Sequence, residues 1–177
     1  SLWVHKASHH FDLLNWWIDS DPESVYALGS LDHYGKNGTF RAENCRTCPH
    51  TSKCKFFFDI TKKRNMMNLY VANEKYDGYL RGGCVFKNDV NIFDKMAATI
   101  RYKNGVQVAY SLTTYSPYEG YRIAFNGTKG RLEAWIQESR PTSDVNFDEL
   151  VLFKNFGKRE YIQIPFGTSG HGGGDAL

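Results

Sequence analysis

The sequence predicts an α+β domain, in which a largely antiparallel sheet of about six strands or more carries helices on one face. One segment near the start of the chain has helical periodicity, and almost every segment from Ile92 onward alternates apolar and polar residues between turn signals. Strands joined in sequence by short turns pair antiparallel. The chain has 177 residues, about one domain's worth, so we expect a single domain over residues 1–177.

The first expected element is a helix from about Ser8 to Asp19. Ser8 can cap its N-terminus, and a proline follows shortly after Asp19 as a stop signal. Phe11, Leu14 and Ile18 recur at the spacing that is typical of the buried face of a helix. The last turn of this helix, LLNWWI, is apolar, and we expect its two tryptophans to be buried.

A strand is expected next, in the stretch ESVYALGSLDHYG, where Val25 and Ala27 are alternating apolar residues. The chain from Gly35 to about Asp77 is polar and irregular, and it is too long for an ordinary connection. We therefore expect either a functional loop or an insertion, with a short helix around Met66–Ala72.

The remaining strands follow one another through short turns. The segment DKMAATIRYKNGVQVAYSLTTY alternates on both sides of an Asn-Gly pair, which is the strongest short signal for a β-hairpin. Four further strands are expected in YRIAFNG, TKGRLEAWI, DELVLFKN and KREYIQIPF. The sheet face without helices is expected either to face solvent or to pair with a second subunit.

Charge and hydropathy exclude two classes of partner. The 22 basic and 19 acidic residues give a formal net charge of +3 and are scattered along the chain, so no nucleic acid is expected. No apolar run approaches the roughly 18 residues of a membrane span. The chain starts at Ser1 with no signal-like segment and ends in HGGGDAL, and both ends look as though they were cut from a longer polypeptide.

The opening segment, SLWVHKASHHFD, is rich in titratable side chains. His9 and Asp12 lie one helical turn apart, and imidazole titrates near neutral pH beside a carboxylate that can orient it. The pair is therefore a candidate general acid or base. The alternative is a polar helix start with surface histidines.

The segment CRTCPHTSKC offers four candidate zinc ligands within ten residues: Cys45, Cys48, His50 and Cys54. Reduced thiols or a single disulfide are the alternatives. A second Cys-x-x-Cys motif is missing and Cys84 stands alone in the sequence, so no metal site is predicted.

The terminal HGGGD has the glycines of an anion-binding loop, but it lacks the strand and helix that normally flank one, and a frayed terminus is the alternative. The sequence contains no Gly-x-Gly-x-x-Gly motif and no parallel βαβ pattern. If the protein uses a nucleotide, the nucleotide-binding domain lies elsewhere.

Four stretches carry a family resemblance: HKASHHFDLLNWWIDSDPESVYALG, EKYDGYLRGGCVF, AYSLTTYSPYEGYRIAFNGTKGRLE and GHGGGD. Together they resemble the C-terminal domain of the glucose-fructose oxidoreductase, inositol dehydrogenase and MocA (Gfo/Idh/MocA) family. The resemblance implies a two-domain enzyme whose N-terminal Rossmann domain, absent from this chain, binds NAD or NADP. The present domain would supply substrate contacts and a homo-oligomer interface, and it would be inactive when isolated.

The resemblance also implies roles for individual residues. Family members oxidise or reduce a sugar or cyclitol hydroxyl, and His9 matches the histidine that acts as acid or base on that hydroxyl. The family's catalytic lysine lies in the nucleotide domain, so Lys6 does not take that role. The substrate-binding candidates are His5, Lys6, Asp12, His171 and Asp175.

Two alternatives to a dehydrogenase stay open from the sequence. Some family members cleave glycosidic bonds through NAD-dependent chemistry on the same fold. A non-catalytic binding or assembly module would use the aromatic sheet as an interaction surface, although this gives no reason for the KASHHFD cluster. The cysteines, expected to be reduced, favour a cytoplasmic location.

Overall fold

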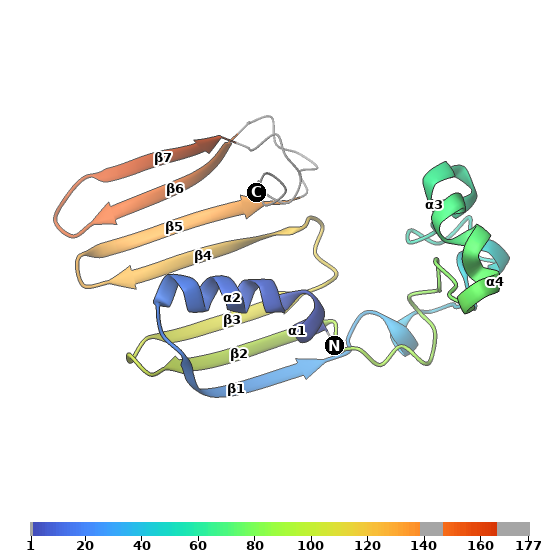
Figure 1. Ribbon diagram of the computed structural model, residues 1–177, viewed down its shortest axis with the longest axis horizontal. Helices are drawn as coiled ribbons and strands as arrows, with labels where there is room; N and C mark the ends of the chain where they lie inside the picture. Colours follow the sequence, from blue (N-terminus) through green and yellow to red (C-terminus); the bar gives the residue numbers. More distant parts are fainter. Residues whose placement is uncertain (1, 139–146, 166–177) are drawn as a thin grey trace. The chain divides into compact units, whose positions relative to one another are not determined.

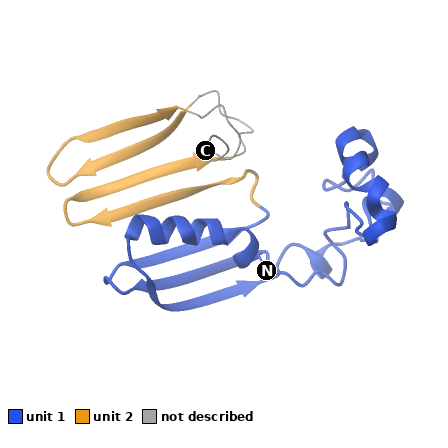
Figure 2. Cartoon of the chain, viewed as in Figure 1, with its two compact units in different colours: residues 1–115 blue, residues 116–177 orange. Residues whose placement is uncertain are grey.

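The computed structural model describes residues 2–138 and 147–165. The chain divides into two compact units, residues 1–115 and residues 116–177 (Figure 2). The first unit contains the helices and a three-stranded sheet, and the second contains a four-stranded sheet. All strand pairs in both sheets are antiparallel, which confirms the α+β class.

The first unit opens with two helices and then builds its sheet in the order β1-β2-β3 (Figure 1). Its elements are α1 (Leu2–His5), α2 (Ala7–Ile18), β1 (Pro22–Ser30), β2 (Lys95–Tyr102) and β3 (Gln107–Thr113). The β2–β3 hairpin turns where the Asn-Gly pair predicts it, with Gly105 at a φ of 88° and the Tyr102 N–H donating to the Val106 carbonyl at 2.9 Å.

The start of α2 differs from the expectation that Ser8 caps it. The N-cap is Lys6, whose side chain makes no capping hydrogen bond. The chain enters α2 directly from α1, since the Lys6 N–H already donates to the Leu2 carbonyl at 3.0 Å. The predicted stop is confirmed, because Asp19 adopts the left-handed conformation and its N–H donates to the Asn15 carbonyl.

The core of the first unit lies between α2 and the sheet. Every second residue of β2 is buried, and the centre of the cluster consists of Ala98, Ile100 and Tyr102. Phe11 and Ile18 pack against it from α2, which confirms the predicted buried face of this helix. α2 lies over the sheet in Figure 1. Packing of this kind fixes both the position and the rotation of the helix.

The two tryptophans of α2 are not buried, contrary to the expectation. The side chain of Trp16 is 76% exposed and that of Trp17 is 40% exposed. Leu14 takes the inward position, and at about 100° per residue a side chain two positions later points away from the core. Strand β1 is also exposed along almost its whole length. Val25 is opposite Ile100 in the register and still remains 67% exposed.

The long irregular segment connects β1 to β2, and we call residues 32–93 the insertion. It carries short helical turns, which are η1 (Gly35–Asn37), η2 (Cys45–Thr47), η3 (Ile60–Lys62), α3 (Arg64–Leu69), η4 (Val71–Asn73) and α4 (Glu74–Asp77). The helix expected around residue 66 is α3, which begins two residues earlier and gives way to η4.

Asp94 closes the base of the insertion. Its side chain is 1% exposed, and its two carboxylate oxygens accept N–H bonds from Asp32, His33 and Tyr34 at 2.8–2.9 Å. The Asp94 N–H also donates to the Ser30 carbonyl at 3.0 Å. One buried carboxylate therefore joins the first residues of the insertion to the start of β2.

The second unit is a meander with the strand order β4-β5-β6-β7. Its strands are β4 (Gly120–Gly127), β5 (Gly130–Gln137), β6 (Phe147–Lys154) and β7 (Arg159–Pro165). All four predicted strands are present, so six strands follow Ile92 as expected. In the described residues the strands form two sheets of three and four strands, and no ladder joins β3 to β4.

Candidate functional site

The outward face of α2 carries the two residues that the sequence predicts for acid or base chemistry. His9 and Asp12 are exposed and lie three positions apart, so they are neighbours on the helix surface. Within residues 2–138 and 147–165, no hydrogen bond or ion pair is recorded between them. Both side chains are therefore available to a ligand on this face.

His10 belongs to the inward face and has a different role. Its Nδ1 lies 2.8 Å from the Tyr110 hydroxyl of β3. Burial raises the pKa of Tyr110 to about 12, so this hydroxyl keeps its proton at neutral pH. Phe11 stacks on Trp3 with ring centroids 5.5 Å apart. These contacts fix the start of α2, and with it the direction in which His9 points.

His5 and Lys6 lie at the junction of α1 and α2, and both are exposed. They share the polar end of the helix pair with His9, as the sequence predicts. Sequence reasoning missed Trp16, which is four positions after Asp12 on the same exposed face. The spacing from Asp12 already puts this indole on the face of the polar side chains, but only the packing of α2 on the sheet reveals that the indole is exposed rather than in the core.

Comparison with known proteins identifies the family. A family model described as "Oxidoreductase family, C-terminal alpha/beta domain" matches residues 1–149. The chain belongs to the Gfo/Idh/MocA oxidoreductase family. It is also 33% identical over 193 aligned positions to YteT of Bacillus subtilis (strain 168), which is named as an oxidoreductase. That alignment covers 99% of this chain and 45% of YteT, so the chain spans less than half the length of this relative.

Two of the residues that the Gfo/Idh/MocA resemblance assigns to substrate binding, His171 and Asp175, lie outside the described residues. The other four candidates, His5, Lys6, His9 and Asp12, all come from the first helical segment. In the part of the chain that the structure describes, no helix is long and apolar enough to span a bilayer.

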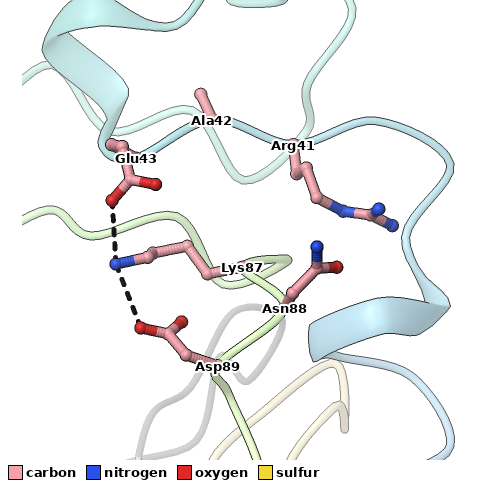
Figure 3. A pocket seen from close by; sticks show the side chains of 6 residues that line it. All are labelled: Arg41, Ala42, Glu43, Lys87, Asn88 and Asp89. Atoms are coloured by element: carbon pink, nitrogen blue, oxygen red, sulfur yellow. Dashed lines mark ion pairs between the residues drawn. The ribbon is translucent and has the colours of Figure 1, made fainter.

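The insertion also contains a shallow pocket, which is lined by Arg41, Ala42, Glu43, Lys87, Asn88 and Asp89 (Figure 3). The Lys87 ammonium pairs with Glu43 at 3.0 Å and with Asp89 at 3.2 Å. These two carboxylates raise the pKa of Lys87, which therefore stays charged. No residue that the sequence predicts for catalysis lines this pocket, and its lysine is already held by two partners.

The four cysteines, Cys45, Cys48, Cys54 and Cys84, are free and partly buried. Among the described residues, no three side chains of His, Cys, Asp or Glu are arranged to hold a metal ion. The ring of His50, the fourth residue of the candidate set in the sequence, packs against Phe40 with centroids 4.9 Å apart.

Proposed function

We propose that this chain is the substrate-binding and oligomerisation domain of an NAD(P)-dependent oxidoreductase that acts on a sugar or cyclitol hydroxyl. Membership of the oxidoreductase family supports the reaction class. The observation that carries the proposal is the outward face of α2, where His9 and Asp12 are exposed side by side on a helix whose other face packs on the sheet. A rigid support of this kind holds a proton-transfer group in a constant position.

In this proposal His9 takes the proton from the substrate hydroxyl during oxidation and returns it during reduction. An imidazole can both accept and donate a proton, which suits both directions. Asp12 accepts hydrogen bonds from neighbouring hydroxyls of the substrate, and Lys6 and His5 donate to its oxygens. Trp16 presents an apolar surface beside these polar groups, the combination with which proteins bind one face of a sugar ring.

The described residues do not fit the dinucleotide itself. Every strand pair among them is antiparallel, so residues 2–138 and 147–165 contain no parallel βαβ unit to hold a pyrophosphate. We therefore assign NAD or NADP to an N-terminal Rossmann domain of the full-length protein. This assignment also explains our expectation that the isolated chain is inactive.

The uncovered face of the first sheet is our candidate for the homo-oligomer interface. Tyr26 and Leu28 face away from the α2 side by the register of β1, and they are 69% and 63% exposed. Apolar side chains on an open sheet face are typical of subunit interfaces. Light scattering of the full-length protein should show a dimer or tetramer, and a monomer at high concentration would contradict this part of the proposal. The free cysteines favour a reducing compartment such as the cytoplasm.

The experiment uses the full-length protein, which is first tested for bound NAD or NADP and then screened with sugars and cyclitols at the reduced-nicotinamide absorbance. We expect His9→Ala to lower kcat by about 10²–10⁴-fold while dinucleotide affinity stays the same. Asp12→Asn should raise KM more than it lowers kcat, because it weakens substrate hydrogen bonds.

The matched control is Ser8→Ala, which changes an exposed neighbour on the same helix and should leave both constants unchanged. Wild-type turnover of the His9→Ala variant would contradict the role of His9. A full-length protein that binds neither dinucleotide would favour the assembly module, whereas release of a free sugar from a glycoside would make the reaction a glycosidic cleavage.

A further inference from the structure

We propose that Cys45, Cys48, Cys54 and Cys84 bind one structural Zn²⁺ ion as four thiolates, and that this ion organises the insertion. The sequence supplies three of these cysteines close together, and the structure adds the fourth. The proposal is independent of the chemistry at His9.

The fourth cysteine reaches the others through an isolated antiparallel bridge between Asn44 and Gly83. On either side of this bridge the Cys45 N–H donates to the Gly82 carbonyl at 2.9 Å, and the Cys84 N–H donates to the Glu43 carbonyl at 3.1 Å. Residues one position away from a bridged pair lie on the same face of the two strands. Cys45 and Cys84 therefore share the face opposite Asn44, as diagonal neighbours.

Side chains next to the bridge also connect the two segments. The Arg41 Nε donates to the Phe86 carbonyl at 3.1 Å, and Lys87 pairs with Glu43 across the same two segments (Figure 3). The segment with Cys84 is thus attached to the segment with Cys45 on both sides of Glu43. The backbone of the insertion therefore places the segments that carry these two cysteines side by side.

The Cys-x-x-Cys segment forms a tight turn with a backbone donor on one of its sulfur atoms. Its residues form η2, in which the Cys48 N–H donates to the Cys45 carbonyl at 3.4 Å. The His50 N–H donates to the Cys48 Sγ at 3.4 Å, and backbone donors to a ligand sulfur are a common outer support of metal sites. The Cys54 N–H donates to the His50 carbonyl at 3.0 Å, so the third cysteine follows directly on a second hydrogen-bonded turn.

The insertion has only a small core. In residues 32–93, all of which the structure describes, the only large apolar side chains that are buried are Ile60 and Phe86, and the Phe86 ring contacts the rings of Phe40 and Phe56. A segment with so small a core is where structural zinc contributes folding free energy. The four sulfur atoms are not gathered in the described chain, and we propose that the ion draws them together, each thiol releasing one proton.

The choice of a fourth thiolate over His50 rests on two observations. The His50 ring packs against the Phe40 ring. The contacts of His50 with the cysteines come from its backbone, whose N–H donates to the Cys48 Sγ and whose carbonyl accepts from the Cys54 N–H. Four sulfur ligands favour a tetrahedral zinc ion. His50 therefore provides the matched control for the experiment.

The first test is the metal content of the full-length protein, purified from zinc-supplemented cells without chelators and measured by elemental mass spectrometry. We expect about one zinc per chain. Cys84→Ser should lose most of this zinc, and His50→Ala should retain it. The opposite result, in which His50→Ala loses the zinc and Cys84→Ser retains it, would overturn the four-cysteine site.

A second measurement keeps the proposal testable if Cys84→Ser fails to fold. The wild-type protein is stripped with a chelator and reloaded with Co²⁺, which should give the sulfur-to-cobalt charge-transfer absorption and the strong visible bands of a tetrahedral thiolate site. Limited proteolysis should then cleave residues 32–93 faster in the stripped protein than in the reloaded one. Four titratable thiols with no metal, a disulfide, or iron with inorganic sulfide would each overturn the proposal.

Discussion

The three-stranded sheet and the insertion between two of its strands are stabilised in different ways. The sheet buries every second side chain of β2 under α2, and its strands pair along most of their lengths. The insertion buries only Ile60 and Phe86 among its large apolar side chains and relies more on single polar groups. Asp94 accepts from three backbone donors, and the Arg41 guanidinium donates to the carbonyls of Phe86, Lys36 and Gly38.

This difference decides how each region responds to substitution. Apolar packing spreads its free energy over many contacts, so similar side chains can replace one another. A buried polar group has fixed hydrogen-bond partners. When the group is removed, each partner stays buried without a hydrogen bond, which destabilises the fold by the free energy of desolvating that partner. We therefore expect damage to the sheet to be global, and damage to the insertion to be local and tied to a few named residues.

The largest effect is expected from Ile100→Ala in the sheet. Ile100 is 6% exposed at the centre of the core cluster, and its truncation leaves a cavity against α2. We expect a loss of about 3 kcal/mol in the free energy of unfolding, measured with a chemical denaturant. Thr99→Ala, at the exposed neighbouring position, is the control and should change it little. Equal effects at the two positions would show that the core is elsewhere.

A smaller, local effect is expected from Asp94→Asn at the base of the insertion. The new amide has one acceptor oxygen instead of two, so its NH2 group must face at least one of the three backbone N–H donors, those of Asp32, His33 and Tyr34. The local cost should be about 2 kcal/mol. Hydrogen exchange should accelerate in residues 32–34 while the β2–β3 hairpin keeps its protection. Asp89→Asn, an exposed carboxylate in the same region, should change neither.

The same carboxylate gives a pH dependence. Burial alone would raise the pKa of Asp94, but the backbone N–H bonds from Asp32, Tyr34 and His33 outweigh burial and hold this pKa below its ordinary value. A lowered pKa in the folded state stabilises the protein above the unfolded-state pKa of about 3.9 and loses this contribution as the pH falls further. The difference in stability between wild type and Asp94→Asn should be constant near neutral pH and shrink below about pH 4. A difference that grows in acid would contradict this linkage.

The smallest effect is expected from Glu43→Gln in the shallow pocket. Glu43 is 79% exposed, and Lys87 keeps its second partner, Asp89. We expect the melting temperature to shift by less than about 2 °C. A larger shift in thermal unfolding would mean that ion pairs, rather than Asp94 and the proposed zinc site, hold the insertion together.

Local patterns predicted the parts of the fold that depend on neighbouring residues. The β2–β3 hairpin followed from alternation around an Asn-Gly pair, and the buried face of α2 followed from the spacing of Phe11, Leu14 and Ile18. The division into two sheets and the exposure of Trp16 could not be predicted, because both depend on which elements meet in space.

The candidate site divides in the same way. Spacing alone identified His9 and Asp12 as neighbours on one helix. It did not separate His9 from His10, which faces Tyr110 because the packing of α2 on the sheet sets the rotation of the helix. Nor could it bring Cys84 to Cys45, since the bridge that joins their segments forms between residues far apart in the sequence.

The insertion lies between two strands that pair directly, and this placement affects the order of folding. The β2–β3 hairpin closes through a short turn, a process that takes on the order of microseconds. β1 and α2 precede the insertion, so they reach this hairpin only after a long and entropically costly loop closure. We expect the hairpin to act as the template of the first unit and α2 to dock late. The helix that carries His9 would then be among the first elements to detach when the domain partly unfolds, before its strands separate.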